Sequence, residues 1–227
     1  MRLLQAFVCI VMLSQGSVSA QDNTGTSGAM YAESDGAPAS DSGVSVTVDD
    51  SLVILPRDIV LVLDNSGSMK ITDPDFQITA AISDFISQLG DETNLAIIVF
   101  DQQIRLAVSL TPASGDNQQR ILSGLEQLNY NGLFRDTPTA IERAVYELRN
   151  NGREEAAKHI VFITDGVSQT DNNATQLERS EWLVNELAET AVANNIRISG
   201  IGFTENADMN LIQALADKTG GEAYQLL

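Results

Sequence analysis

The chain contains very few cysteine, histidine and basic residues, and each scarcity excludes a class of function. Its 227 residues include one Cys and one His, too few for the thiolate and imidazole ligands of a zinc site. There are 13 Lys+Arg against 31 Asp+Glu, a formal net charge of −18. No run of Lys and Arg interrupts this excess of acid. Nucleic acid and anionic membrane surfaces would therefore be repelled, and we expect neither as a partner.

Long apolar runs are also scarce, and the main exception lies at the start of the chain. Residues 1–20, MRLLQAFVCIVMLSQGSVSA, place one positive charge before an apolar run and end in small residues. This layout is typical of a secretory signal peptide cleaved after Ala20, and the run is about half as long as a membrane-spanning helix needs. The only cysteine, Cys9, lies in this segment. We therefore expect a secreted or periplasmic product without cysteine and without a membrane span.

The rest of the chain divides into a polar segment and a folded domain. Residues 21–56 begin with small, polar and acidic residues, which bury too little surface to offset their ordering entropy. We interpret them as a flexible acidic linker. Apolar runs and amphipathic stretches then alternate over 57–227, and this alternation predicts a single α/β domain.

The expected elements of this domain follow from hydrophobic periodicity. Continuous apolar runs predict buried strands at 59–63, 95–100, 160–164, 196–203 and 223–226, and helical spacing predicts helices at 75–89, 119–128, 139–148, 175–194 and 208–218. The link 101–103 is too short for a crossover, so a strand at 104–110 must pair antiparallel with 95–100. We expect an open, doubly wound, mostly parallel sheet with one antiparallel edge strand and helices on both faces.

Short oxygen-bearing side chains follow two of the predicted strands. Asp64-Asn65-Ser66-Gly67-Ser68 comes after the first strand, and Asp165-Gly166 comes after 160–164. In open α/β sheets the ligand crevice lies beyond the carboxyl ends of the strands. Two carboxylates, two serine hydroxyls and a threonine from the loop before 139–148 would form an all-oxygen site. Such a site suits Mg²⁺, Mn²⁺ or Ca²⁺ and leaves one position open for an outside oxygen.

The segments LVLDNSGSM, TAIERAVYEL and VFITDG resemble the metal-ion-dependent adhesion site of von Willebrand factor type A (VWA) domains. The resemblance spans 57–227, and it implies a VWA domain with a doubly wound fold. The metal-site residues that it implies on the two strand-end loops are Asp64, Ser66, Ser68 and Asp165. For the threonine of this site, Thr139 fits better than Thr137, because the apolar face of the following helix then falls where the family places it. Mg²⁺ is the expected ion, with Mn²⁺ or Ca²⁺ as alternatives.

The function that the resemblance implies is protein binding in adhesion or complex assembly, with a partner carboxylate completing the coordination of the metal. The excess of acid suggests a basic partner surface. The alternatives are a metal-dependent hydrolase or phosphatase with Asp64 as nucleophile, or a structural VWA domain without a ligand. Catalysis is disfavoured because His159 lies at the start of the strand that Asp165 follows, ~20 Å away, and no other base is evident. We expect no enzyme.

Three large apolar residues, Tyr130, Leu133 and Phe134, lie in the loop that leads to the threonine. Exposed, they would form a rim that holds a partner. Buried, they would pack beneath their own loop, which the general burial tendency of such residues favours.

Overall fold

The computed structural model describes residues 56–166 and 173–226, with the side chains of 173–177 left aside. The predicted signal peptide (1–20) and almost all of the predicted linker (21–56) lie outside these residues. In the described part of the chain, no helix is long and apolar enough to cross a membrane.

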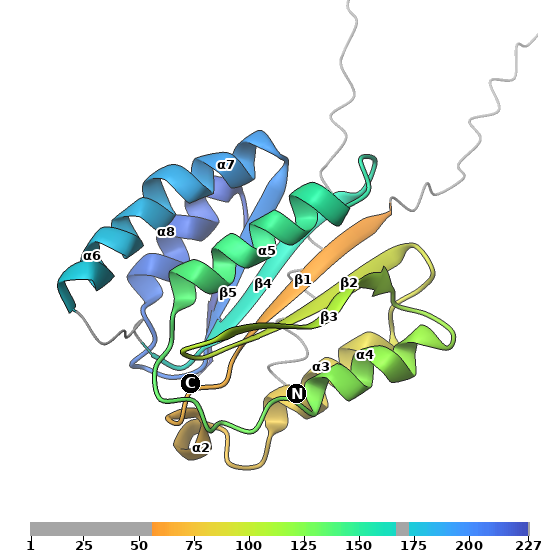
Figure 1. The fold of residues 1–227 in the computed structure, drawn as a ribbon, viewed down its shortest axis with the longest axis horizontal. Coiled ribbons are helices and arrows are strands. Elements are labelled where there is room, and N and C mark those ends of the chain that lie inside the picture. Colours follow the sequence, from red (N-terminus) through yellow and green to blue (C-terminus); the bar gives the residue numbers. More distant parts are fainter. Residues whose placement is uncertain (1–55, 167–172, 227) are drawn as a thin grey trace, which may run out of the picture. The chain divides into compact units, whose positions relative to one another are not determined.

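The described domain is built on a six-stranded sheet in the order β3-β2-β1-β4-β5-β6 (Figure 1). The strands are β1 (Arg57–Asp64), β2 (Thr93–Phe100), β3 (Ile104–Pro112), β4 (Ala157–Thr164), β5 (Ile196–Gly202) and β6 (Ala223–Gln225). All neighbours are parallel except β2 and β3, which are antiparallel. The predicted fold class is confirmed, including the antiparallel edge strand that the three-residue link requires.

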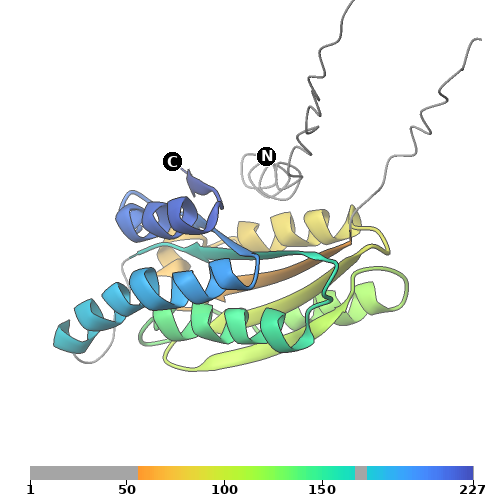
Figure 2. The ribbon, with the colours of Figure 1, turned by 90° about the horizontal axis from the view of Figure 1, so that it is seen from above.

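Helices cover both faces of this sheet, and Figure 2 shows the strands as a layer between α3 and α5. The helices are α2 (Met69–Thr72), α3 (Gln77–Ser87), α4 (Asn117–Leu125), α5 (Thr137–Asn151), α6 (Asn173–Trp182), the π-helix η1 (Leu183–Leu187), α7 (Ala188–Ala193) and α8 (Met209–Thr219). The long helix predicted at 175–194 is therefore interrupted by a π-helical turn, which widens the helix locally and has no marker in the sequence.

The strand β1 has a core on each side. Ile59, Leu61 and Leu63 pack with residues of α3 and α4, whereas Val60 and Val62 pack with residues of α5. Successive side chains of a strand point to opposite faces, so an unbroken apolar run is what a strand covered on both faces requires. This burial makes β1 a rigid support for the loop that follows it.

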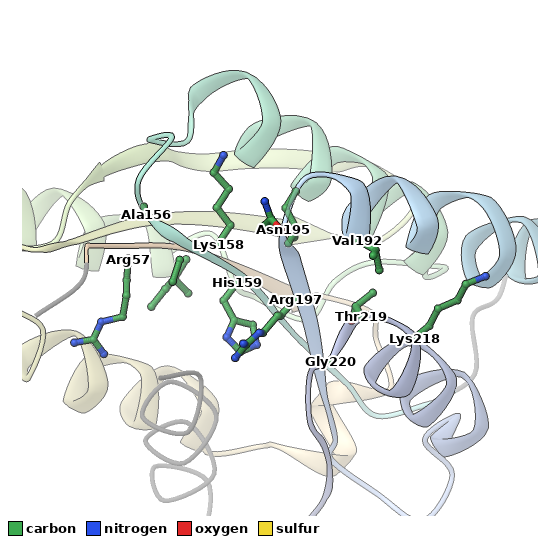
Figure 3. A pocket seen from close by; sticks show the side chains of 13 residues that line it. Arg57, Ala156, Lys158, His159, Val192, Asn195, Arg197, Lys218, Thr219 and Gly220 are labelled. Carbon is green, nitrogen blue, oxygen red and sulfur yellow. The ribbon is translucent and has the colours of Figure 1, made fainter. Parts of the chain in front are cut away.

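A cavity of about 490 Å³ lies at the amino ends of β1, β4 and β5. Four basic side chains line it, those of Arg57, Lys158, Arg197 and Lys218 (Figure 3). Lys158 pairs with Ile196 in the sheet, so Lys158 and Arg197 belong to opposite faces. Lys158 and Arg197 therefore do not converge on one point.

The only histidine also lies at this end. His159 is buried and makes a 2.7 Å hydrogen bond with Ser199. Burial, together with the positive charge of Arg197, lowers the pKa of His159 to about 4. It is thus a neutral structural residue at neutral pH, at the opposite end of β4 from Asp165.

The point where strand order reverses lies at the other end of the sheet. From β1 the chain passes to β2 on one side, and it later returns to place β4 on the other side. The loops after β1 and β4 therefore separate in opposite directions from neighbouring strands and leave a crevice at their carboxyl ends.

Candidate functional site: a polar cluster after β1 and β4

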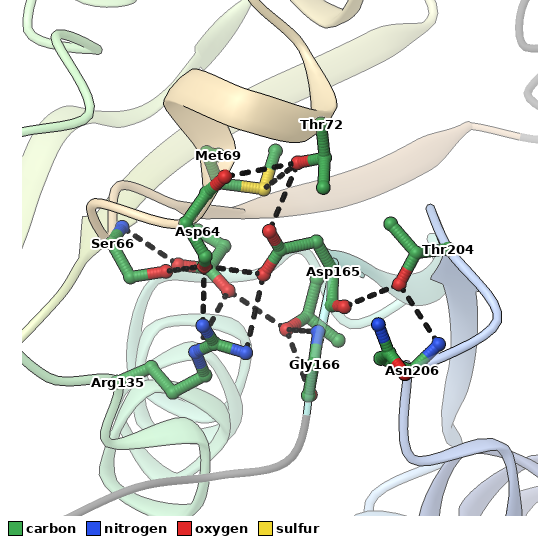
Figure 4. A network of polar contacts seen from close by, with 11 residues as sticks. Asp64, Ser66, Met69, Thr72, Arg135, Asp165, Gly166, Thr204 and Asn206 are labelled. Carbon is green, nitrogen blue, oxygen red and sulfur yellow. Dashed lines mark hydrogen bonds and ion pairs between the residues drawn. The ribbon is translucent and has the colours of Figure 1, made fainter.

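The structure brings four of the predicted site residues together. Ser66 donates its backbone N–H to Asp64 Oδ1 at 2.8 Å, and the Ser66 and Ser68 hydroxyl oxygens lie 3.2 Å apart. The Ser68 hydroxyl donates to Asp165 Oδ1 at 2.8 Å, which joins the loop after β1 to the loop after β4 (Figure 4). We call Asp64, Ser66, Ser68 and Asp165 the polar cluster.

The loop after β1 turns sharply into the single turn of α2. The Gly67 N–H donates to the carbonyl of Gly132 at 2.8 Å, and a Cβ on Gly67 would lie 3.2 Å from that same oxygen. A glycine here lets the two loops approach closely. Met69 is fully buried beneath the turn. The loop is thus held from below by an apolar anchor and from the side by the segment that leads to α5.

The fifth group in the cluster is Arg135. Its Nη1 lies 3.1 Å from Asp165 Oδ1, its Nε lies 3.8 Å from Asp64 Oδ2, and its Nη2 donates to the Ser68 hydroxyl. In Figure 4 the guanidinium points between the two carboxylates. The residue is only 7% exposed. Arg135 therefore places a positive charge inside the site where the sequence predicted a metal ion.

The electrostatics of Asp64 reflect this arrangement. Burial raises the pKa of Asp64, while Arg135 and hydrogen bonds from Ser66 and Thr164 act in the opposite direction without cancelling the effect of burial. The Thr164 hydroxyl donates to Asp64 Oδ2 at 2.8 Å. Asp64 is thus a buried carboxylate that depends on its partners to stay charged.

Asp165 is also fully engaged. Its second carboxylate oxygen accepts a hydrogen bond from the Thr72 hydroxyl at 2.9 Å, and its backbone carbonyl accepts one from Thr204 at 2.6 Å. Neither threonine is among the residues that the sequence predicts for the site. Thr72 lies four residues after Ser68, so one helical turn brings it to the same side of α2, which is a signal that the spacing contains.

The two threonine candidates lie at the start of α5. Thr139 donates its hydroxyl to Asp136 Oδ2 at 2.9 Å and its hydroxyl also contacts the Arg179 guanidinium, so it belongs to a neighbouring polar group at the start of α5. Thr137 is buried at the first position of that helix. The residue of this segment that reaches the cluster is Arg135. The available signal was the formal charge of −2 on Asp64 and Asp165, which an arginine in the loop before α5 can compensate.

The oxygen side chains of the cluster favour binding of a divalent cation, whereas Arg135 disfavours it. Carboxylate and hydroxyl oxygens are the ligands that such a cation prefers. However, the Arg135 guanidinium already contacts Asp64, Ser68 and Asp165, and a second cation among the same oxygens would be strongly repelled at this buried position. With Arg135 in place, the cluster does not fit a divalent cation.

A shallow cavity of about 340 Å³ opens over the cluster. It is lined by Ser68, Ile71, Thr72, Arg135, Asp165, Gly166, Thr204 and Asn206. Ile71 is 84% exposed beside it. In the loop before α5, Leu133 is 76% and Phe134 is 40% exposed, so the expectation that these two pack beneath their loop is wrong.

For Tyr130 the same expectation is confirmed. Its side chain is buried, its ring stacks on Phe76 with centroids 4.6 Å apart, and its hydroxyl donates to Asp73 at 2.7 Å. Tyr130 has a backbone φ of +55°, which turns the chain so that its own ring points inward. Leu133 and Phe134, later in the same loop, are exposed.

Comparison with known proteins places this architecture in a family. The von Willebrand factor type A domain model matches residues 58–226. The protein "Uncharacterized protein sll0103" of Synechocystis sp. is 26% identical over 198 residues, which cover 82% of this chain and 42% of that protein. The chain thus spans about two fifths of this relative.

Solved structures with the same fold include the von Willebrand factor type A protein from Catenulispora acidiphila, with a TM-score of 0.62 and 18% identity over 76% of this chain and 39% of that one. The vWF domain of the pili tip protein Mfa5 from Porphyromonas gingivalis has a TM-score of 0.60 at 13% identity, covering 76% of this chain and 90% of that one. The pilus adhesin SpaC from Lactobacillus rhamnosus GG has a TM-score of 0.58 at 17% identity, covering 76% and 28%. The chain belongs to the von Willebrand factor type A domain family.

Proposed function

We propose that this chain is an extracytoplasmic protein-binding module, acting in adhesion or in the assembly of a complex, whose partner docks over the polar cluster. The observation that carries the proposal is the set of exposed apolar side chains around the cluster. Ile71 lies on its α2 side, and Leu133 and Phe134 immediately precede Arg135. We call these three residues the docking rim.

The docking rim has the composition of a binding surface. A large apolar side chain gains about 1.5–3 kcal/mol when it moves from water into a packed contact. Apolar contacts around a few fixed polar groups combine affinity with orientation. Leu133 is held in place by its N–H, which donates to Gln102 Oε1 at 2.8 Å. The surface is therefore prearranged, which lowers the cost of ordering on binding.

Two of the structural neighbours are, by description, a pilus adhesin and a pili tip protein. Their likeness supports the fold, and adhesion for this chain is our proposal. The secretory character of residues 1–20 supports an extracytoplasmic location. The net charge of −18 favours a partner with a basic surface, which long-range attraction would steer toward the domain.

The resemblance to metal-dependent adhesion sites led us to expect a divalent cation between the cluster and a partner carboxylate. The four oxygen side chains support that expectation, but the position of Arg135 argues against it. We therefore propose that the partner binds the docking rim and the residues that line the cavity over the cluster, without a step that uses a metal.

We also propose that the site is not catalytic. Asp64, the candidate nucleophile of a hydrolase, is 2% exposed and its carboxylate oxygens bond with the Ser66 N–H and the Thr164 hydroxyl. An attacking carboxylate needs free access to its substrate. His159, the only histidine, lies at the far end of β4. This arrangement supports a binding role over the hydrolase alternative.

The test uses the exported full chain as bait in the extracytoplasmic fraction of its host. We compare the wild type with the variant Ile71→Ser/Leu133→Ser/Phe134→Ser and with Tyr146→Ser/Val192→Ser, which removes exposed apolar residues from α5 and α7. Circular dichroism checks that all three are folded. We expect the first variant to lose at least about tenfold of the captured partner and the second to capture as much as the wild type, because burial of the rim supplies the binding energy. Equal capture by both variants would refute the docking rim.

A further inference from the structure

We propose that Arg135 is the resident cation of the polar cluster, and that its guanidinium closes the site to divalent cations. The cluster is then complete without a metal. The proposal concerns the same face as the proposed function, and it rests on that function only for its corollary that partner binding needs no divalent cation.

The first argument is the match between the guanidinium and its surroundings. The side chain of Arg135 is 8% exposed, and the side chains of Asp64 and Asp165 are 0% and 1% exposed. A guanidinium is planar, carries five N–H donors and stays charged at every physiological pH. It therefore serves two carboxylates and a hydroxyl at once, as a compact cation would.

The second argument is charge balance. Asp64 and Asp165 contribute a formal charge of −2, and Arg135 reduces it to −1. Two buried carboxylates without a cation would be strongly unfavourable, because desolvation penalises each charge. A divalent cation added to the present set would change the local charge to +1 and would face the guanidinium across the same oxygens. Arginine and metal are therefore alternatives at this site.

The third argument is that the chain makes room for the arginine. A Cβ added to Gly166 would collide with Nη1 of Arg135. The guanidinium thus packs against the backbone of the residue directly after Asp165, and a side chain at that position would have to displace it. The seat of the arginine is formed by the loop after β4 as well as by the carboxylates.

The fourth argument is that the backbone on both sides of Arg135 is fixed. Gly132 N–H donates to the Asn65 carbonyl at 3.0 Å, and Asp136 N–H donates to the Asp101 carbonyl at 3.1 Å. Asp136 also caps α5 by accepting the Thr139 N–H at 3.2 Å. The backbone of Arg135 is therefore held beside the cluster, and this favours placement of its side chain in the cluster.

The test is titration of Mg²⁺ and Mn²⁺ into the full chain by calorimetry. The variants are Arg135→Thr, which replaces the cation by an oxygen ligand, and Gly166→Ala, which pushes the guanidinium aside and keeps its charge. Arg120→Ala, an exposed arginine on α4, is the matched control. We expect no binding by the wild type or the control at millimolar metal. Arg135→Thr should bind at least about tenfold more tightly than the wild type, and Gly166→Ala should fall between them, because repulsion by the guanidinium is removed or reduced.

Thermal unfolding gives an independent measurement, including the case in which Arg135→Thr folds poorly without metal. In EDTA this variant should unfold at a lower temperature than the wild type, and Mg²⁺ should raise its unfolding temperature by mass action. The wild type should show no change. Metal binding or metal stabilisation of the wild type equal to that of Arg135→Thr would overturn the proposal. So would an Arg135→Thr chain that folds and gains no affinity for either ion.

The capture experiment separates this proposal from the proposed function. If both hold, the wild type captures its partner equally in EDTA and in Mg²⁺, and the docking-rim variant fails in both. Capture that needs Mg²⁺ and still depends on the docking rim would refute the resident arginine and leave the binding function standing. If the docking-rim variant captures as much partner as the wild type in both buffers, the proposed binding face is refuted and the resident arginine is not.

Discussion

The backbone N–H of Tyr130 donates a hydrogen bond to the side-chain oxygen of Asn65 at 2.8 Å. The same oxygen accepts the Asn129 N–H at 2.8 Å, and the Asn65 amide nitrogen donates to Asp101 Oδ2 at 2.9 Å. One buried side chain thus connects the loop after β1, the loop before α5 and the end of β2. Because Arg135 lies five residues after Tyr130, Asn65 positions the segment that carries the arginine into the cluster.

We predict that Asn65→Ala lowers the free energy of unfolding by about 2–4 kcal/mol, because the N–H groups of Asn129 and Tyr130 and the buried Asp101 carboxylate each lose a hydrogen-bond partner. Urea unfolding measures the loss. Asn150→Ala, an exposed asparagine near the end of α5, is the control and should cost less than about 0.5 kcal/mol. A similar small loss at Asn65 would show that the loop is positioned by other contacts.

We predict that Tyr130→Phe costs about 1–2 kcal/mol of stability. The Tyr130 hydroxyl donates to Asp73 Oδ2, and Asp73 also accepts the backbone N–H groups of Gln77 and Ile78 at the start of α3. Burial and the nearby Asp73 carboxylate raise the pKa of Tyr130, so its proton stays in place as a donor at every pH of interest. The phenyl ring keeps the stacking on Phe76, so the variant isolates the hydrogen bond.

The control for that measurement is Tyr146→Phe, whose ring is exposed on α5. Urea unfolding at neutral pH should show less than about 0.5 kcal/mol for this variant. A loss at Tyr130 no larger than at Tyr146 would mean that Asp73 is satisfied without the phenol.

The position of the cluster was predictable because it depends on topology. Parallel strands end at the same edge of a sheet, so Asp64 after one apolar run and Asp165 after another had to lie close together once β1 and β4 were neighbours. Periodicity and the length of the connections predicted the strands, and the joining of the two loops in one site is what the resemblance to VWA domains implies. Neither inference needed the path of any loop.

The presence of Arg135 in the cluster was not predictable in this way. Thr139 was chosen from the apolar face of the following helix, which determines the phase of α5 and carries no information on the loop before it. That path depends on contacts distant in sequence, such as the pairing of Ser66 with Gly132 and the bonds from Asn65 to Tyr130. The same contacts decide that Tyr130 is buried and that Leu133 is exposed.

We predict that His159 makes stability fall on acidification. Its pKa is lowered to about 4 in the folded chain from an ordinary 6.5. Between pH 6.5 and about pH 4, His159 is therefore protonated in the unfolded chain and neutral in the folded chain. Stability is therefore fully present above pH 6.5 and is lost progressively toward pH 4, by about 3 kcal/mol from this residue. Urea unfolding between pH 7 and pH 4 measures the slope.

The control for this pH dependence is His159→Gln, which retains a polar group near Ser199 and does not titrate. Carboxylates contribute to both curves, so the difference between wild type and variant isolates the imidazole. That difference should change by about 3 kcal/mol across the window. Parallel curves would show that His159 is protonated in the folded chain as readily as in the unfolded one.

At the amino end of the sheet, Arg153 stabilises the buried carboxylate of Asp58. The Arg153 backbone N–H donates to Asp58 Oδ2 at 2.6 Å and its Nε donates to Oδ1 at 2.9 Å, while Nη2 donates to the carbonyls of Arg57 and Glu92 at 2.7 and 2.9 Å. One side chain thus joins the starts of β1 and β2 to the segment after α5. Asp58 is fully buried, so its charge has to be compensated within the protein.

We predict that Arg153→Ala lowers the free energy of unfolding by about 3–5 kcal/mol, because it leaves a buried carboxylate without its cation. Arg153→Lys should recover only part of this loss, since an ammonium group does not reproduce the planar fork that reaches a carboxylate and two carbonyls together. The double variant Asp58→Ala/Arg153→Ala should be more stable than Arg153→Ala alone, because the uncompensated charge is then gone. Urea unfolding of the wild type, Asp58→Ala, Arg153→Ala and the double variant completes a double-mutant cycle. A double variant less stable than Arg153→Ala would show that Asp58 stabilises the fold through its backbone contacts and not through its pairing with the arginine.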